Sequence, residues 1–224
     1  MNVPEVLAQG FAQDDGVLEL RPQVLINYIL DESTMRVKAS FDSLTLKRQV
    51  LLGPGGRISV NGVRLTLGGA EPTGVYWGHV PLGDGQLNFE LVRSATVQSS
   101  FSVRLPTYRF VEYPKTFRYP ENLTFRLATP VVFPVRKAVE DDFWMRIRSN
   151  QSVIFSFDQG APLTTESSVV VLRPIRTPFV PSSLPKVTAY FSRNQRLALS
   201  DLAVEYRAGW IVMTVAHEFL IDVL

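Results

Sequence analysis

Apolar and polar residues alternate with a period of two along much of this chain, and this pattern predicts short, half-buried β-strands. Between residues 35 and 41 apolar side chains hold the odd positions, whereas Arg36, Lys38 and Ser40 hold the even ones. Because successive side chains of a strand point to opposite faces, such a segment buries only one face. Similar alternation recurs at residues 87–91, 123–127, 143–147 and 211–223.

Turn residues separate these segments and favour an all-β fold. Asn61-Gly62 lies between two β-rich arms, residues 57–60 and 63–67. Both central residues of a type I′ turn need positive φ, which Asn and Gly tolerate best, so this stretch predicts a tight hairpin. Turns recur at the spacing of roughly 8–12 residues found in β-sandwiches. No segment keeps a period of about 3.6 with helix caps, so we expect little helix.

A proline-rich stretch, residues 105–124, divides the predicted strands into two runs. We therefore expect two tandem immunoglobulin-like β-sandwich domains, residues 17–105 and 106–224. A length of 224 residues suits two domains that each bury a core. Residues 1–16 are small and polar and end in Asp14-Asp15-Gly16, which predicts an N-terminal tether.

Charge and cysteine content exclude several classes of protein. The chain has 23 Lys and Arg against 21 Asp and Glu, a net charge of +2. Residues 1–105 carry nine basic and ten acidic residues, and neither half shows the clustered basic face of a nucleic-acid-binding protein. The absence of Cys excludes disulfides, thiol catalysis and thiolate metal sites. No apolar run reaches the roughly 18 residues of a transmembrane helix.

The order of several segments resembles a family of bacterial envelope proteins. VNGVRLTL, VYWGHVP, DGQLNFELVRS and FSVRLP follow one another in the first half, and FRYPENLTFRLATP opens the second. Over about residues 50–130 this order resembles that of bacterial envelope lipoproteins built from tandem immunoglobulin-like sandwiches. The resemblance implies an architecture and a location in the periplasm or at the cell surface, rather than an activity.

The start of the sequence bears on the expected location. MNVPEVLAQGFAQDDG has neither the basic region nor the apolar region of a signal peptide. We expect that a signal has been removed ahead of Met1, and a cytoplasmic location is the alternative. Because the chain has no Cys to carry a lipid, we expect peripheral membrane association only if a lipid anchor was removed in the same way.

No catalytic, metal or cofactor site is predicted. His79 and His217 are the only imidazoles, whereas zinc sites use three or four ligands. His217 falls on the apolar face of the last predicted strand, which favours a packed histidine. Residues 53–56, Gly-Pro-Gly-Gly, lack the Lys-Ser/Thr of a phosphate loop, and no nucleophile elbow is present. The acidic run 140–142 lacks the spacing of a calcium loop and predicts a solvated loop.

A candidate ligand-binding surface lies on one predicted strand. Trp144, Arg146 and Arg148 share its outward face. An indole beside two guanidinium groups can stack on a sugar ring or hold a carboxylate or phosphate. The alternatives are that this face meets the neighbouring domain, or that the arginine stems cover the indole. Tyr76-Trp77 is instead assigned to the core, since sandwiches often bury one Trp.

Three functional hypotheses follow. The first is a non-enzymatic protein of the bacterial cell envelope, either structural or binding an envelope protein or glycan that the sequence does not identify. The second is a β-sandwich that binds carbohydrate or an anionic ligand through Trp144. The third, a metal-assisted hydrolase using His79 and His217 with carboxylates, is the least supported because the sequence offers so few ligands.

Overall fold

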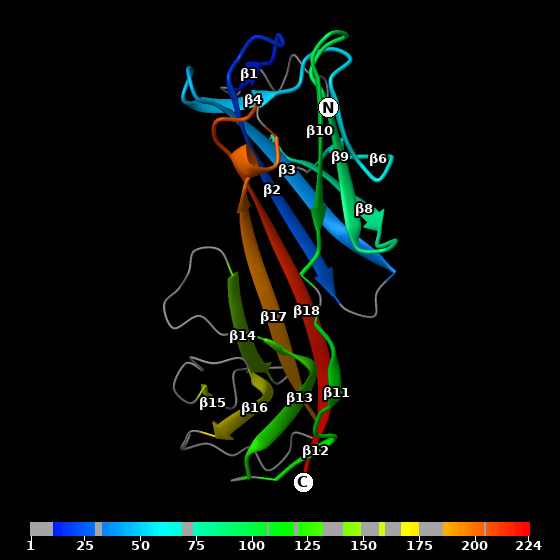
Figure 1. Ribbon diagram of the computed structural model, residues 1–224, viewed down its shortest axis with the longest axis vertical. Coiled ribbons are helices and arrows are strands. Elements are labelled where there is room, and N and C mark those ends of the chain that lie inside the picture. Colours follow the sequence, from blue (N-terminus) through cyan, green and yellow to red (C-terminus); the bar gives the residue numbers. More distant parts are fainter. Residues whose placement is uncertain are drawn as a thin grey trace. The chain divides into compact units, whose positions relative to one another are not determined.

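The computed structural model describes the chain in ten stretches and shows an all-β protein (Figure 1). Within these stretches the only helical element is a single 3-10 turn, η1 (Leu199–Asp201). The all-β class predicted from the alternation is therefore confirmed. The immunoglobulin-like topology of the two domains stays a prediction. The described residues are 11–29, 33–68, 74–106, 108–118, 121–131, 141–148, 157–159, 167–174, 186–203 and 205–224.

The chain forms two compact units. The first contains Met1–Tyr28, Glu32–Leu105 and Gln195–Thr214, and the second contains the remaining residues. The first unit includes Gln195–Thr214, whereas the predicted domain boundaries place these residues in the second domain; the two domains stay a prediction. The difference arises because two long strands, β17 (Lys186–Ala198) and β18 (Trp210–Val223), each contribute to both units. The alternation of apolar and polar residues within a strand does not show that different parts of the strand belong to different units.

Two sheets make up the first unit. In one, the strands follow the order β1-β4-β3-β2-β18, with β8 also paired to β3 and β7 to β8. In the other, the order is β10-β9-β5-β6. The strands are β1 (Ala12–Gln13), β2 (Leu20–Ile29), β3 (Thr34–Ser43), β4 (Arg48–Leu51), β5 (Arg57–Val60), β6 (Val63–Arg64), β7 (Thr66–Leu67), β8 (Tyr76–Pro81), β9 (Gln86–Val92) and β10 (Gln98–Arg104).

Strand β3 shows how the alternation builds the core of this unit. Met35, Val37 and Phe41 are buried, and the even positions between them face outward. β3 is antiparallel to β2 on one side and to β8 on the other, which extends the same two faces across three strands. The predicted hairpin is also present, since Val60 pairs with Val63 across Asn61 and Gly62, both of positive φ.

Residues 11–16 differ from the predicted tether. Ala12 and Gln13 form β1, which pairs with β4 in parallel. The side chain of Asp14 is fully buried and accepts two hydrogen bonds of 2.7 Å from the guanidinium of Arg93. Arg93 also donates to the carbonyl of Leu18 at 2.5 Å. Sequence pattern does not predict this ion pair, because its members lie 79 residues apart and an Asp-Asp-Gly run is typical of exposed turns.

Two buried tyrosines predict a loss of stability at alkaline pH. Burial raises the pKa of Tyr76 and of Tyr206 above the ordinary 10.0. The Tyr76 hydroxyl accepts a hydrogen bond from the Leu52 backbone, and that of Tyr206 bonds to Ser99. Above pH 10.0 the unfolded chain loses these protons first, so stability is retained below that pH and falls as the pH rises through the folded-state values.

Urea unfolding across this pH range tests whether ionisation of the two tyrosines lowers the stability of the fold. We expect the free energy of unfolding to be flat up to about pH 9.5 and to fall above about pH 10. A protein carrying both Tyr76→Phe and Tyr206→Phe is less stable at neutral pH, because it lacks the hydroxyl bonds. Above about pH 10, however, its free energy of unfolding should fall less steeply than that of the unaltered protein. An equally steep decline in both proteins would assign the effect to other groups.

The second unit has an aromatic core. Phe110, Phe125, Phe191 and Phe219 are all buried, and their ring centroids lie between 4.5 and 6.0 Å apart. The hydroxyl of Tyr108 lies 3.0 Å from the Phe191 carbonyl and 3.2 Å from that of Val215. One sheet has the order β11-β13-β16-β15, and β12 and β14 join β18 and β17. These strands are β11 (Phe110–Glu112), β12 (Thr116–Phe117), β13 (Leu123–Val131), β14 (Asp141–Arg148), β15 (Phe157–Gln159) and β16 (Ser167–Pro174).

Candidate functional site

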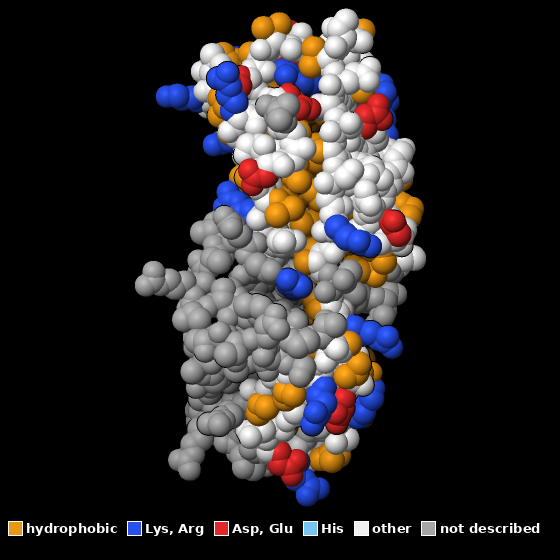
Figure 2. Space-filling view, viewed as in Figure 1, with side chains coloured by type: hydrophobic (Ala, Val, Ile, Leu, Met, Phe, Trp, Pro, Cys, Tyr) orange, Lys and Arg blue, Asp and Glu red, His pale blue; other side chains and the backbone are white. Residues whose placement is uncertain are grey.

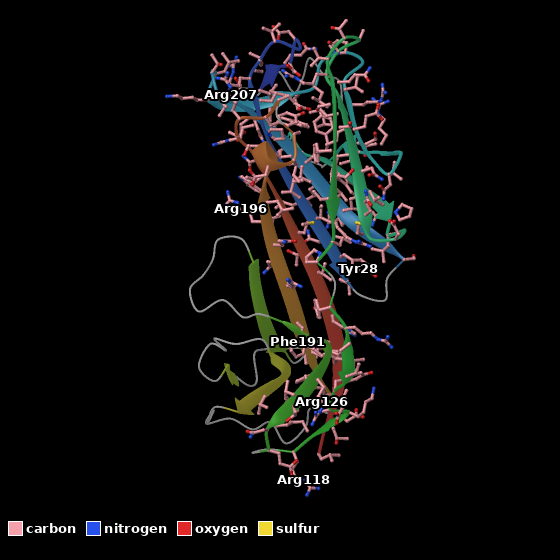
Figure 3. All side chains as sticks on the ribbon, in the orientation of Figure 1. Tyr28, Arg118, Arg126, Phe191, Arg196 and Arg207 are labelled. Atoms are coloured by element: carbon pink, nitrogen blue, oxygen red, sulfur yellow. The ribbon has the colours of Figure 1, made fainter. Side chains whose placement is uncertain are left out.

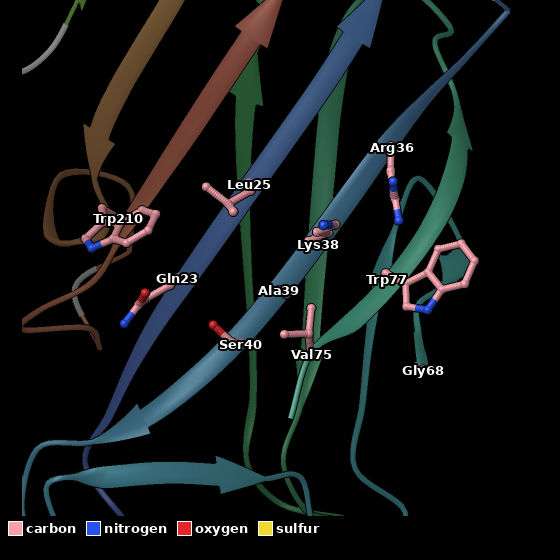
Figure 4. Close-up of a pocket in the computed structure, with 10 residues that line it drawn as sticks. All are labelled: Gln23, Leu25, Arg36, Lys38, Ala39, Ser40, Gly68, Val75, Trp77 and Trp210. Atoms are coloured by element: carbon pink, nitrogen blue, oxygen red, sulfur yellow. The ribbon is translucent and has the colours of Figure 1, made fainter. Parts of the chain in front are cut away.

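The outward face of the larger sheet in the first unit carries a groove of about 430 Å³ (Figure 4). This volume lies within the range of about 300–1,000 Å³ that small-molecule sites occupy. We call it the tryptophan groove. Its walls come from β2, β3, β8 and the first residue of β18, and it is lined by Gln23, Leu25, Arg36, Lys38, Ala39, Ser40, Gly68, Val75, Trp77 and Trp210.

Strand pairing brings the lining residues together. Lys38 of β3 pairs with Leu25 of β2 and with Trp77 of β8, so these three side chains form one row across the sheet. Arg36 lies two residues along β3 on the same outward face and pairs with His79. Side chains opposite one another on one face have Cβ atoms about 4.5–5.5 Å apart, so each row acts as a single surface.

Trp77 forms one end of the groove. Its indole packs directly on Gly68, where an added Cβ would lie only 2.0 Å from the indole Nε1. The guanidinium carbon of Arg36 lies 5.5 Å from the centre of the indole, within cation–π range. The expectation that Trp77 belongs to the core is wrong, because Trp77 is partly exposed on the outward face. The neighbouring Tyr76 is the buried residue of the pair.

Trp210 forms the other end of the groove in the same way. It is the first residue of β18 and is partly exposed. Arg196 is an exposed residue of β17 (Figure 3). Its guanidinium carbon lies 5.1 Å from the centre of the Trp210 indole ring. Each end of the groove therefore places a flat apolar ring beside a permanent positive charge.

The described residues that line the groove carry positive charge and no negative charge. Arg36 and Lys38 are the charged residues among them, and neither forms an ion pair within the described part of the chain. Arginines elsewhere do pair, as Arg21 does with Asp42 at 2.7 Å. On the face shown in Figure 2, basic and acidic side chains are interspersed. The groove is thus a local cationic surface on a mixed exterior.

The predicted ligand site rests on side chains that the structure does not describe. Trp144, Arg146 and Arg148 belong to β14, but their side chains lie outside the described residues. Of the acidic run 140–142, which was predicted as a loop, Asp141 and Asp142 instead begin β14, and residue 140 lies outside the described residues. The binding role of Trp144 therefore stays a prediction.

The two histidines belong to different units. His79 is exposed near the groove, with its ring centroid 6.0 Å from that of Trp77. His217 is half-buried and stacks on Phe219 at 4.1 Å, which agrees with a packed histidine on the apolar face of the last strand. Across the ten described stretches, no three His, Asp or Glu residues gather as a metal site would require. No helix in those stretches is long and apolar enough to cross a membrane.

Comparison of the chain with protein-family models and with curated proteins gives no match, so the chemistry of the groove is inferred from its own residues. The sequence contained part of the signal, since Arg36 and Lys38 occupy the outward positions of a clear alternation. Two further facts cannot be read from the sequence. One is the pairing register of β3 and β8, which places Trp77 beside Arg36 and Lys38, and the other is the strand order, which adds Trp210.

Proposed function

We propose that this protein is a non-enzymatic binding module that holds an acidic carbohydrate in the tryptophan groove. The observation that carries the proposal is that two indoles each lie beside a cation in one groove, and that none of the described residues lining this groove is acidic. An indole offers a broad apolar surface to the C–H face of a sugar ring. Guanidinium and ammonium groups attract its carboxylates, and Ser40 and Gln23 can hydrogen-bond its hydroxyls.

Aromatic rings beside cations also suit single-stranded nucleic acid, but the surroundings favour the sugar. A nucleic-acid strand needs a positive path that follows its backbone over several nucleotides. Residues 1–105 carry one more acidic than basic residue, and the exterior seen in Figure 2 is mixed in charge. A short acidic ligand confined to the groove avoids the repulsion that a longer polyanion would meet.

Binding without catalysis is favoured by the spacing of the reactive groups. Ser40 is the hydroxyl nucleophile among the lining residues. His79 pairs with Arg36, four residues away from Ser40 along β3, which separates the two by about 13 Å at 3.3 Å per residue. A general base has to lie within about 3 Å of the proton that it abstracts.

A location in the bacterial cell envelope is part of the same proposal. Its support is the sequence resemblance to envelope lipoproteins, together with the acidic sugar polymers that cell surfaces offer to such a groove. An envelope protein as partner, or a spacing role, are the alternatives within this class. The metal-assisted hydrolase is not supported by the described residues, since the two histidines lie in different units.

Calorimetric titration with trigalacturonic acid tests the function. We expect saturable, salt-sensitive binding to the unaltered protein. In the Gly68→Ala variant the new methyl group displaces the Trp77 indole, and we expect binding about tenfold weaker, equivalent to about 1.4 kcal/mol.

The control is Arg104→Ala, which removes an exposed cation from β10 in the other sheet and should leave the affinity unchanged. Equal binding by the Gly68→Ala variant, or tighter binding of oligo-deoxythymidine than of the acidic sugar, would overturn the proposal.

A further inference from the structure

We infer that the tryptophan groove takes a linear acidic oligosaccharide that runs across the strands and stacks on both indoles at once. This inference rests on the proposed function and extends it from a class of ligand to a length and a direction. It follows from the positions of the two indoles, of the cations beside them and of Asp42, a carboxylate on the same face of β3.

The two indoles are too far apart for one sugar ring. Trp77 lies on β8 and Trp210 on β18, and the order of strands between them is β8-β3-β2-β18. Three steps between neighbouring strands amount to about 14 Å, at 4.7–4.9 Å for each step. A single pyranose ring is much shorter than this, so only a chain of several sugars reaches both ends. Figure 4 shows the two indoles at opposite sides of the lining residues.

The cations follow the same direction as the indoles. Arg36 accompanies Trp77, and Arg196 accompanies Trp210. Lys38 lies between the two ends, in the row that joins Trp77 to Leu25. A polymer with a carboxylate on successive sugars would therefore meet a positive charge near each end and another between them.

The surface between the indoles is suited to the middle of such a chain. Leu25 is 39% exposed there and offers an apolar contact for a sugar ring. The ammonium group of Lys38 has no ion-pair partner within the described residues. A chain that crosses the strands can thus keep both kinds of contact along its length.

Asp42 disfavours the other direction, along β3. Asp42 lies on the same outward face as Arg36 and Lys38, beyond Ser40. It accepts hydrogen bonds from Arg21 at 2.7 Å and from Gln23 at 2.5 Å, which hold it in place. An acidic chain that followed β3 would approach this carboxylate more closely than a chain that crosses the strands at Lys38, four residues away.

The test is a series of galacturonic acid oligomers, from the monomer to the hexamer, titrated by calorimetry into the full chain. We expect the affinity to rise at least tenfold between the monomer and the length that spans both indoles, and then to level off. Trp77→Ala and Trp210→Ala should each abolish this rise while keeping the weak binding of the monomer. Arg104→Ala is the control and should keep the full length dependence.

The outcomes separate the inference from the proposed function. If acidic oligomers bind but their affinity does not depend on length, or only one Trp variant has an effect, the ligand occupies one end and the inference is wrong. If no galacturonate oligomer binds, the proposed function itself is wrong. A neutral series of malto-oligosaccharides that binds as tightly would show that the cations take no part.

Discussion

Replacement of Arg93 by Ala should lower the free energy of unfolding by about 3–5 kcal/mol. The carboxylate of Asp14 has no exposed surface, and the guanidinium of Arg93 donates one hydrogen bond to each of its two oxygens. The side-chain hydrogen bonds to Asp14 raise the pKa of Arg93 above its already high ordinary value, so the guanidinium stays positively charged. Loss of Arg93 leaves a buried negative charge with the Gly16 amide as its remaining hydrogen-bond donor among those that the structure describes.

Chemical denaturation of matched variants measures this effect. Arg57→Ala removes a guanidinium from an exposed pair with Glu90, whose side chains are 42% and 47% exposed, and should cost about 0–1 kcal/mol. The loss of stability in Arg93→Lys should lie between the losses in Arg93→Ala and Arg57→Ala. Lys keeps the positive charge but lacks the planar guanidinium that binds both carboxylate oxygens. Equal stabilities of the Arg93→Ala and Arg57→Ala proteins would show that the buried pair does not hold residues 11–16.

Replacement of Phe191 by Ala should also cost about 3–5 kcal/mol, here in the second unit. Phe191 has no exposed surface. Its ring centroid lies 4.6 Å from that of Phe110, 4.5 Å from that of Phe125 and 5.7 Å from that of Phe219. Three aromatic rings around one position cannot collapse into the space that a benzyl group leaves, so a cavity adds to the lost burial.

The same denaturation experiment carries the control for the aromatic core. Leu220 of β18 is 66% exposed, and Leu220→Ala should change the free energy of unfolding by less than about 0.5 kcal/mol. A Phe191→Ala protein as stable as the Leu220→Ala protein would contradict the central place of Phe191 in this core.

The sequence predicted the parts of the fold that local rules decide. Alternation located β3, β9 and β18, and the preference of Asn and Gly for positive φ located the hairpin at residues 61 and 62. Local rules did not predict β1 or the burial of Asp14, since both depend on partners far along the chain. Local rules also could not assign residues 195–214 to the first unit, because no residue pattern marks the point at which a continuous strand leaves one unit and enters the other.

The tryptophan groove could not be predicted from any single segment of the sequence. Trp77 was placed in the core because sandwiches often bury a Trp, yet the period of two gives that place to Tyr76 and sends Trp77 outward. Trp210 joins the groove only because β18 pairs with β2, two strands that begin about 190 residues apart in the sequence. Long-range pairing, rather than local pattern, therefore assembles the site.

Indole NMR signals test the tryptophan groove most directly. The chain has three Trp residues, so the ¹⁵N-labelled protein should give three indole N–H signals, assigned through single Trp→Phe variants. On titration with trigalacturonic acid we predict that the signals of Trp77 and Trp210 shift together along one binding curve while that of Trp144 stays still. A shift of the Trp144 signal alone would contradict the groove and favour the surface formed by Trp144, Arg146 and Arg148.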